Sequence, residues 1–98
     1  MSRQGKRSRQ RTVVDALSIE LAEYFGTTIR FTAIDIRREV KFEFTPGELR
    51  GALNYMRKSG LLYKCGTCKK TGHYKWLMTS SGVVHATRAG TKMAEMLA

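Results

Sequence analysis

The sequence predicts one α+β domain, with three helices followed by a two-stranded β-hairpin and a short C-terminal helix. Three observations support this prediction. Two of the helix starts carry complete capping signals. After Gly60 the hydrophobic period changes from that of a helix to that of a strand. The length of 98 residues leaves room for a single domain, and an apolar content of 42% is enough for a small core.

The first helix is expected over residues 12–25. Apolar side chains recur there at the spacing of one helix face, namely Val14, Leu17, Leu21 and Tyr24. Gly26 is expected to end this helix. The eleven residues before it include five Lys and Arg and only one apolar residue, so they have little to bury. We therefore expect residues 1–11 to form a flexible basic arm and residues 12–98 to form the folded domain.

The second and third helices have capping boxes, in which Thr32 pairs with Asp35 and Thr45 pairs with Glu48. Pro46 strengthens the third start, because proline suits the first helical position. The two helices are expected over residues 33–40 and 46–59.

The chain after Gly60 is predicted to form a hairpin. Its strands are expected over residues 61–65 and 73–78, and a loop with two glycines and two lysines joins them. Tyr74, Trp76 and Met78 share one face of the second strand, and Tyr74 and Trp76 are expected to pack in the core beneath the hairpin. Residues 79–82 interrupt the pattern. A short last helix is expected over residues 88–97, with Met93, Met96 and Leu97 on its apolar side.

This order of elements on a basic chain resembles a winged helix-turn-helix domain. The resemblance rests on residues 32–40, on residues 45–60 and on the hairpin over residues 61–78. It implies that the third helix, over about residues 46–59, is a recognition helix that enters the major groove of DNA. It also implies that the hairpin, called the wing, touches the DNA backbone or the minor groove.

The net charge of +10 points to the same kind of partner. Eighteen Lys and Arg stand against eight Asp and Glu. Folding does not explain this excess, because like charges repel in the compact state. A polyanion does explain it, since each neutralised phosphate releases counterions. Double-stranded DNA is therefore the expected partner.

The third helix holds the residues best suited to read bases. Arg50, Asn54 and Lys58 lie opposite its apolar stripe, with Arg57 at the margin. Arginine can bind guanine edges and asparagine can bind adenine. The other candidate contacts are basic residues of the arm, the second helix and the wing loop, namely Arg7, Arg9, Arg11, Arg37, Lys69 and Lys70.

Cys65, Cys68 and His73 have the spacing of a zinc knuckle, whose last cysteine would fall at Met78. Methionine is not a zinc ligand of such sites, so a fourth ligand would have to be His85 or come from another chain. We expect two free thiols, no metal and no cofactor.

The function expected from these residues is DNA binding by a sequence-specific transcriptional regulator. An RNA-binding, ribosome-associated winged-helix protein and a protein-interaction module stay open as alternatives. No phosphate-binding glycine loop or nuclease metal signature is present, so we do not expect an enzyme. We expect no membrane span, because no apolar run approaches ~18 residues. A cytoplasmic location is expected, and so is a homodimer formed through the last or the first helix.

Overall fold

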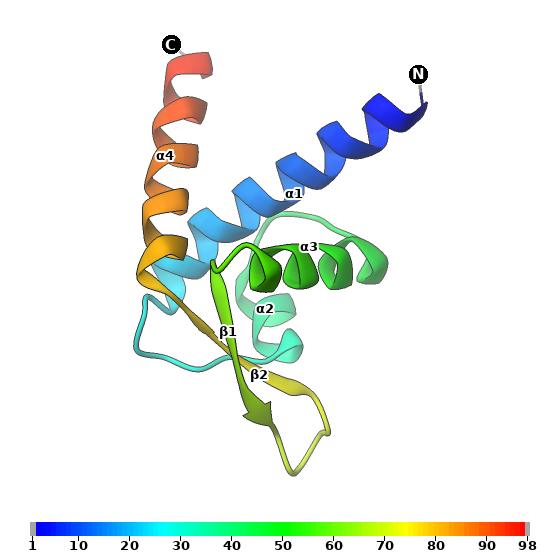
Figure 1. Ribbon diagram of the computed structural model, residues 1–98, viewed down its shortest axis with the longest axis vertical. Coiled ribbons are helices and arrows are strands. Elements are labelled where there is room, and N and C mark those ends of the chain that lie inside the picture. Colours follow the sequence, from blue (N-terminus) through cyan, green and yellow to red (C-terminus); the bar gives the residue numbers. More distant parts are fainter. Residues whose placement is uncertain (1, 98) are drawn as a thin grey trace.

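The computed structural model describes the backbone of residues 2–97 and the side chains of residues 9–92, 94 and 95. The elements follow in the order α1 (Ser2–Tyr24), α2 (Ala33–Glu39), α3 (Pro46–Lys58), β1 (Leu62–Thr67), β2 (Tyr74–Met78) and α4 (Ser80–Leu97). Figure 1 shows that α1 and α4 meet at the base of α4 and diverge toward the two termini. The hairpin projects from the opposite end of the molecule, and α2 and α3 lie between the hairpin and α1.

The core forms where the apolar faces of α1, α2 and α3 meet the base of the hairpin. Leu17 and Leu21 of α1, Ile36 of α2 and Met56 of α3 are all fully buried. The predicted apolar stripes of the first and third helices are therefore confirmed. The buried side chains of α3 are Leu49, Ala52, Leu53 and Met56.

The hairpin is antiparallel and carries a third, very short pairing. Leu62 pairs with Met78 and Lys64 with Trp76, with a register shift between Lys64 and Gly66. On the free edge of β2, the backbone N–H of Trp76 donates to the Phe31 carbonyl at 2.8 Å, and the Phe31 N–H donates back at 2.9 Å. These bonds attach the loop after α1 to the wing and cover part of an otherwise open strand edge.

The helix α1 begins at Ser2, so the predicted start at Thr12 is wrong. Residues 2–11, expected to form an arm, continue the helix. The physical reason is that Arg, Lys and Gln have high helix propensity and no proline interrupts them. A lack of apolar residues excludes burial of a segment, but it does not exclude a helix that extends from a buried one.

The helix α4 also begins earlier than predicted, at Ser80 instead of Arg88. In residues 79–82, where the sequence predicts an interruption, Thr79 is the N-cap and the next three residues begin the helix. Thr79 Oγ1 accepts a hydrogen bond from the Gly82 N–H at 3.0 Å and donates to the Gly60 carbonyl at 2.6 Å. Threonine at this position satisfies a backbone donor that the first helical turn leaves unpaired.

Gly82 of α4 packs closely against the backbone of Leu61, the residue before β1. A Cβ atom at this position would meet the Leu61 carbonyl oxygen and would lie 2.8 Å from Met78 Cγ. Gly82→Ala is therefore expected to lower the free energy of unfolding by about 1–3 kcal/mol, the usual cost of overpacking. Urea denaturation measures this change. Gly90→Ala is the control, because Gly90 lies on the same helix and a Cβ atom added there would have no neighbouring atom within 4 Å. Equal stability of the two variants would contradict the close approach.

No described helix is both long enough and apolar enough to span a lipid bilayer.

Candidate nucleic-acid interface

Hydrogen bonds within the two capping boxes define where α2 and α3 begin. The Thr32 N–H donates to Asp35 Oδ2 at 2.9 Å, and the Thr45 N–H donates to Glu48 Oε1 at 2.8 Å. Each threonine hydroxyl accepts in return from the backbone of its partner. Both predicted capping boxes are confirmed, and with them the starts of the two helices.

Glu20 of α1 holds the turn between α2 and α3. Its carboxylate accepts hydrogen bonds from the backbone N–H groups of Lys41 at 2.8 Å and Phe42 at 3.0 Å. These bonds orient α3 relative to α1. The sequence does not indicate this role, because the partners are more than twenty residues apart and no local pattern connects them.

The outer face of α3 is made of polar and basic side chains. Arg50, Asn54, Arg57 and Lys58 are all exposed, as their positions opposite the apolar stripe predict. Within residues 9–92, no carboxylate lies within ion-pair distance of these three cations. Their hydrogen-bond donors therefore face solvent and are free to bind an acidic partner.

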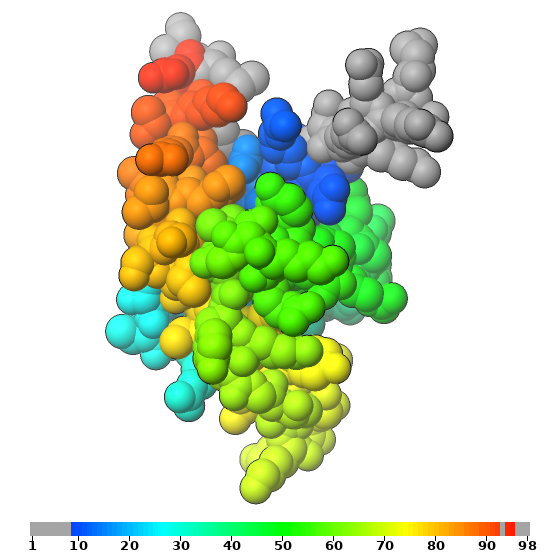
Figure 2. All heavy atoms as spheres, in the orientation of Figure 1, coloured from blue at the N-terminus to red at the C-terminus, as the bar shows by residue number. Residues whose placement is uncertain are grey.

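The wing, defined here as β1, β2 and the loop between them, lies on the same face of the molecule as α3. Figure 2 shows the side chains of α3 in green directly above those of the wing in yellow-green. Lys69 and Lys70 are exposed in its loop. A bond from the Gly72 N–H to the Cys68 carbonyl at 2.8 Å closes this loop, and Gly72 has the positive φ of 74° that the turn requires.

Trp76 and Met78 are buried, but the core position expected for Tyr74 is wrong. Tyr74 is 51% exposed and pairs with Thr67 at the end of the two strands nearest the loop. The ammonium group of Lys64 lies 3.6 Å from the centre of its ring, which is a cation–π contact. The exposed ring and this lysine add an aromatic, basic surface to the wing.

The remaining predicted contacts lie in different settings. Arg37 is exposed on α2, whereas its neighbour Arg38 is paired with Asp35 and Glu39. Arg11 is exposed on α1 and lines a cavity beside α4. The side chain of Arg7 lies outside the described residues.

Arg9 makes contacts within the protein. Its Nε lies 2.6 Å from Glu48 Oε2, its Nη2 donates to the Glu43 carbonyl at 2.9 Å, and its guanidinium lies 5.1 Å from the centre of the Phe42 ring. These contacts hold α1 against the start of α3. The contact of Arg9 with DNA stays a prediction, and the structure adds a role that the sequence analysis did not anticipate.

The Arg9–Glu48 pair predicts a defined response to acid. The hydrogen bond from Arg9, helped by the one from the Thr45 backbone, lowers the pKa of Glu48 from 4.5 to about 2. A carboxyl whose pKa is lower in the folded state stabilises the fold above its unfolded pKa, and this contribution is lost as pH falls. The wild-type melting temperature is therefore expected to fall more steeply than that of Glu48→Gln as pH decreases from 4.5 toward about 2.

Glutamine preserves the capping box, so the comparison isolates the charge of Glu48. Glu43→Gln is the matched control, because the Glu43 carboxylate has no ion-pair partner among the described residues. Parallel melting curves for wild type and Glu48→Gln across this pH window would contradict the prediction.

The structure does not bring the candidate zinc ligands Cys65, Cys68 and His73 together as a group that could hold a metal. Cys65 and Cys68 are free thiols in the wing, and hydrogen bonds from Thr71 lower the pKa of Cys68. Within the described residues, no group of three or more His, Cys, Asp and Glu side chains is arranged to hold a metal. His85, considered above as a fourth ligand, lies on α4 and contacts Asp15 Oδ1 at 2.9 Å. The sequence provided no partner for His85, and only the packing of α4 on α1 supplies one.

Comparison with known proteins identifies the fold. No model of a protein family matches this chain, and no curated protein is similar to it. Among solved structures, a mutant of the winged-helix protein ZitR of Lactococcus lactis, in apo form, is similar with a TM-score of 0.62 and 18% identity. The match covers 98% of this chain and 67% of ZitR. The resemblance stated from the sequence is thereby confirmed, and the chain has the winged helix-turn-helix fold.

Proposed function

We propose that this protein binds double-stranded DNA through α3 and the wing, and that it regulates transcription by occupying its site. The observation that carries this proposal is the outer face of α3, where exposed donor side chains have no carboxylate partner among the described residues of this basic winged-helix chain. A single α-helix fits the major groove of B-form DNA. The protein acts as a binding protein rather than an enzyme, and we propose a cytoplasmic location.

Different residues have different tasks in this proposal. Arg50 and Asn54 contact base edges, because they project from the middle of the exposed face of α3. Lys69 and Lys70 contact phosphates, because they stand at the end of the wing. Arg57 and Lys58 contact phosphates at the end of α3. Base contacts give sequence preference, whereas phosphate contacts give affinity for every sequence.

The same geometry favours DNA over RNA. The major groove of A-form RNA is too narrow for side chains to read. Arg50 and Asn54 on a presented helix would find few base edges there. Binding to ribosomal RNA would also explain the charge of +10, but it would leave this face of α3 without a role.

A homodimer is part of the proposal. The N-terminal half of α1 and the C-terminal half of α4 extend beyond the body of the molecule and diverge from each other (Figure 1). We propose that two copies join through these helices and bind two half-sites about 34 Å apart, the spacing of one DNA turn that dimeric helix-turn-helix proteins commonly use. Light scattering coupled to size-exclusion chromatography measures the mass in solution.

The experiment that tests DNA reading is selection of binding sites from a random duplex library at one fixed salt concentration. Arg50→Ala and Asn54→Ala are each expected to lose about 1–3 kcal/mol of discrimination between sites while the fold is retained. Lys69→Ala and Lys70→Ala are expected to weaken binding to all sequences alike. Arg30→Ala, an exposed cation outside α3 and the wing, is the control.

Two results would contradict the proposal. A change of site preference in the wing variants and not in the helix variants would show that α3 is not the reader. Tighter binding of structured RNA than of duplex DNA, measured by competition on the same gel, would favour the RNA alternative.

A further inference from the structure

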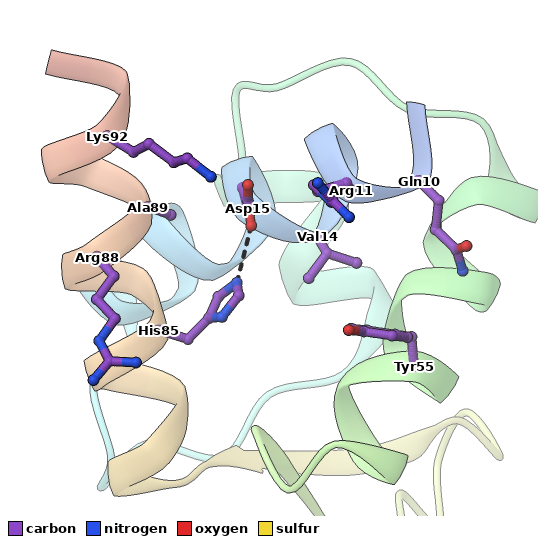
Figure 3. A pocket seen from close by; sticks show the side chains of 9 residues that line it. All are labelled: Gln10, Arg11, Val14, Asp15, Tyr55, His85, Arg88, Ala89 and Lys92. Carbon is purple, nitrogen blue, oxygen red and sulfur yellow. Dashed lines mark hydrogen bonds and ion pairs between the residues drawn. The ribbon is translucent and has the colours of Figure 1, made fainter. Parts of the chain in front are cut away.

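A cavity of about 420 Å³ lies on the side of the molecule where α1, α3 and α4 meet. This volume lies within the range of about 300–1,000 Å³ that small-molecule sites occupy. Figure 3 shows that its walls come from three helices that are distant in the sequence. The cavity is separate from the outer face of α3 and from the wing, so the DNA contacts proposed for these two elements do not account for it.

The charged groups around the cavity favour an anion. Arg11 of α1 and Arg88 and Lys92 of α4 line it. Within residues 9–92, none of these cations has a carboxylate within 4 Å. The acidic residue among the lining side chains, Asp15, is held by His85 at 2.9 Å. An anionic group in the cavity would therefore find several cationic donors and one carboxylate that is already hydrogen-bonded.

The other lining residues favour a ligand in which the anionic group is attached to an apolar part. Val14 and Ala89 are buried residues that also line the cavity. Tyr55 of α3 contributes a ring that is 49% exposed, and its hydroxyl points toward the gap between α3 and α4 (Figure 3). Such a mixture of apolar walls and a few convergent polar groups is typical of sites for small organic molecules.

We propose that this cavity binds a small organic anion, in which a carboxylate or phosphate group is attached to an apolar body. We further infer that the ligand regulates DNA binding, a part that rests on the proposed function. Tyr55 connects the cavity to the proposed DNA-binding surface, because Tyr55 lines the cavity and its neighbour Asn54 lies on the outer face of α3. A bound anion also offsets positive charge near α3, so ligand binding is expected to weaken DNA binding.

The first measurement uses the protein without DNA. Anilinonaphthalene sulfonate, a fluorescent aromatic anion, is titrated into the folded protein, and neutral phenylnaphthylamine is titrated in parallel. Saturable binding of the anion at one site per chain is expected. Benzoate and phenyl phosphate are expected to displace it, whereas benzamide, which is neutral, is not. The difference between benzoate and phenyl phosphate identifies the anionic group that the site prefers.

Variants locate the site. Arg88→Gln and Lys92→Gln are each expected to weaken binding of the sulfonate about tenfold, because each removes a charge-assisted hydrogen bond. Binding of phenylnaphthylamine is expected to stay unchanged. Arg30→Gln, an exposed arginine that does not line the cavity, is the matched control for general attraction to a basic protein. Thermal unfolding of each variant verifies that it is folded.

The second measurement adds duplex DNA and tests the regulatory part. Saturating phenyl phosphate is expected to weaken DNA binding at least about fivefold, as allosteric coupling typically does. Equal sulfonate affinity in wild type, Arg88→Gln and Lys92→Gln would overturn the proposed site, whatever the protein does with DNA. Displacement of the sulfonate by duplex DNA but not by benzoate or phenyl phosphate would also overturn it, because the cations would then be DNA contacts.

Discussion

Trp76→Ala is expected to lower the free energy of unfolding by about 3–5 kcal/mol, as removal of a large buried ring usually does. Trp76 is 5% exposed and belongs to the same buried cluster as Leu53 and Met56 of α3. Its backbone also carries both hydrogen bonds to Phe31. The loss of the ring would leave a cavity where the wing, α3 and the loop after α1 meet. Urea denaturation followed by far-ultraviolet circular dichroism measures the effect.

Tyr74→Ala is the matched control, because this ring belongs to the same strand but is half exposed. It is expected to change stability far less than Trp76→Ala. A Trp76→Ala protein that kept the stability of wild type and lost only DNA binding would contradict the structural role and would make Trp76 a nucleic-acid contact.

Raising the salt concentration is expected to reduce the affinity for duplex DNA steeply. With about six phosphates neutralised, the affinity falls about a thousandfold between 50 and 200 mM salt, because log K decreases by about 0.9 per phosphate for each unit of log salt. The net charge of +10 and the exposed cations of α3 and the wing supply contacts of this kind. Fluorescence anisotropy of a labelled duplex at several salt concentrations measures the slope.

The double variant Lys69→Ala, Lys70→Ala tests whether these two lysines of the wing contribute to the salt dependence. Removal of two phosphate contacts is expected to reduce its magnitude by about two units. Asn54→Ala is expected to leave the slope unchanged, because an amide releases no counterion. A flat affinity across this range of salt would contradict electrostatic binding of DNA.

Signals that lie within a few residues of one another were sufficient to predict much of this fold. The capping boxes Thr32–Asp35 and Thr45–Glu48 predicted two helix starts that the structure confirms. The apolar stripe of α3 predicted which side is buried and which side is exposed. The reason is that capping and amphipathic burial depend on spacing along one helix, and the sequence displays this spacing directly.

Contacts between distant segments decided the features that the sequence analysis missed. The helix α4 begins at Ser80, because Thr79 caps it and because Gly82, which has no side chain, can pack closely against the Leu61 backbone. The tie of Glu20 to the turn before α3 and the pair of His85 with Asp15 both join residues on different elements. Apart from the local N-cap at Thr79, none of these interactions has a signature in either segment alone.

The sequence by itself therefore determined the fold class, the buried face of α3 and the exposed candidates Arg50, Asn54, Lys69 and Lys70. The tertiary structure alone decided that Arg9 pairs with Glu48 at the start of α3, that Tyr74 lies outside the core, and that three cations line a cavity between α1, α3 and α4. The physical reason is one of range. Helix capping and hydrophobic periodicity act between neighbours along the chain, whereas ion pairs and cavities depend on which elements pack against each other in three dimensions.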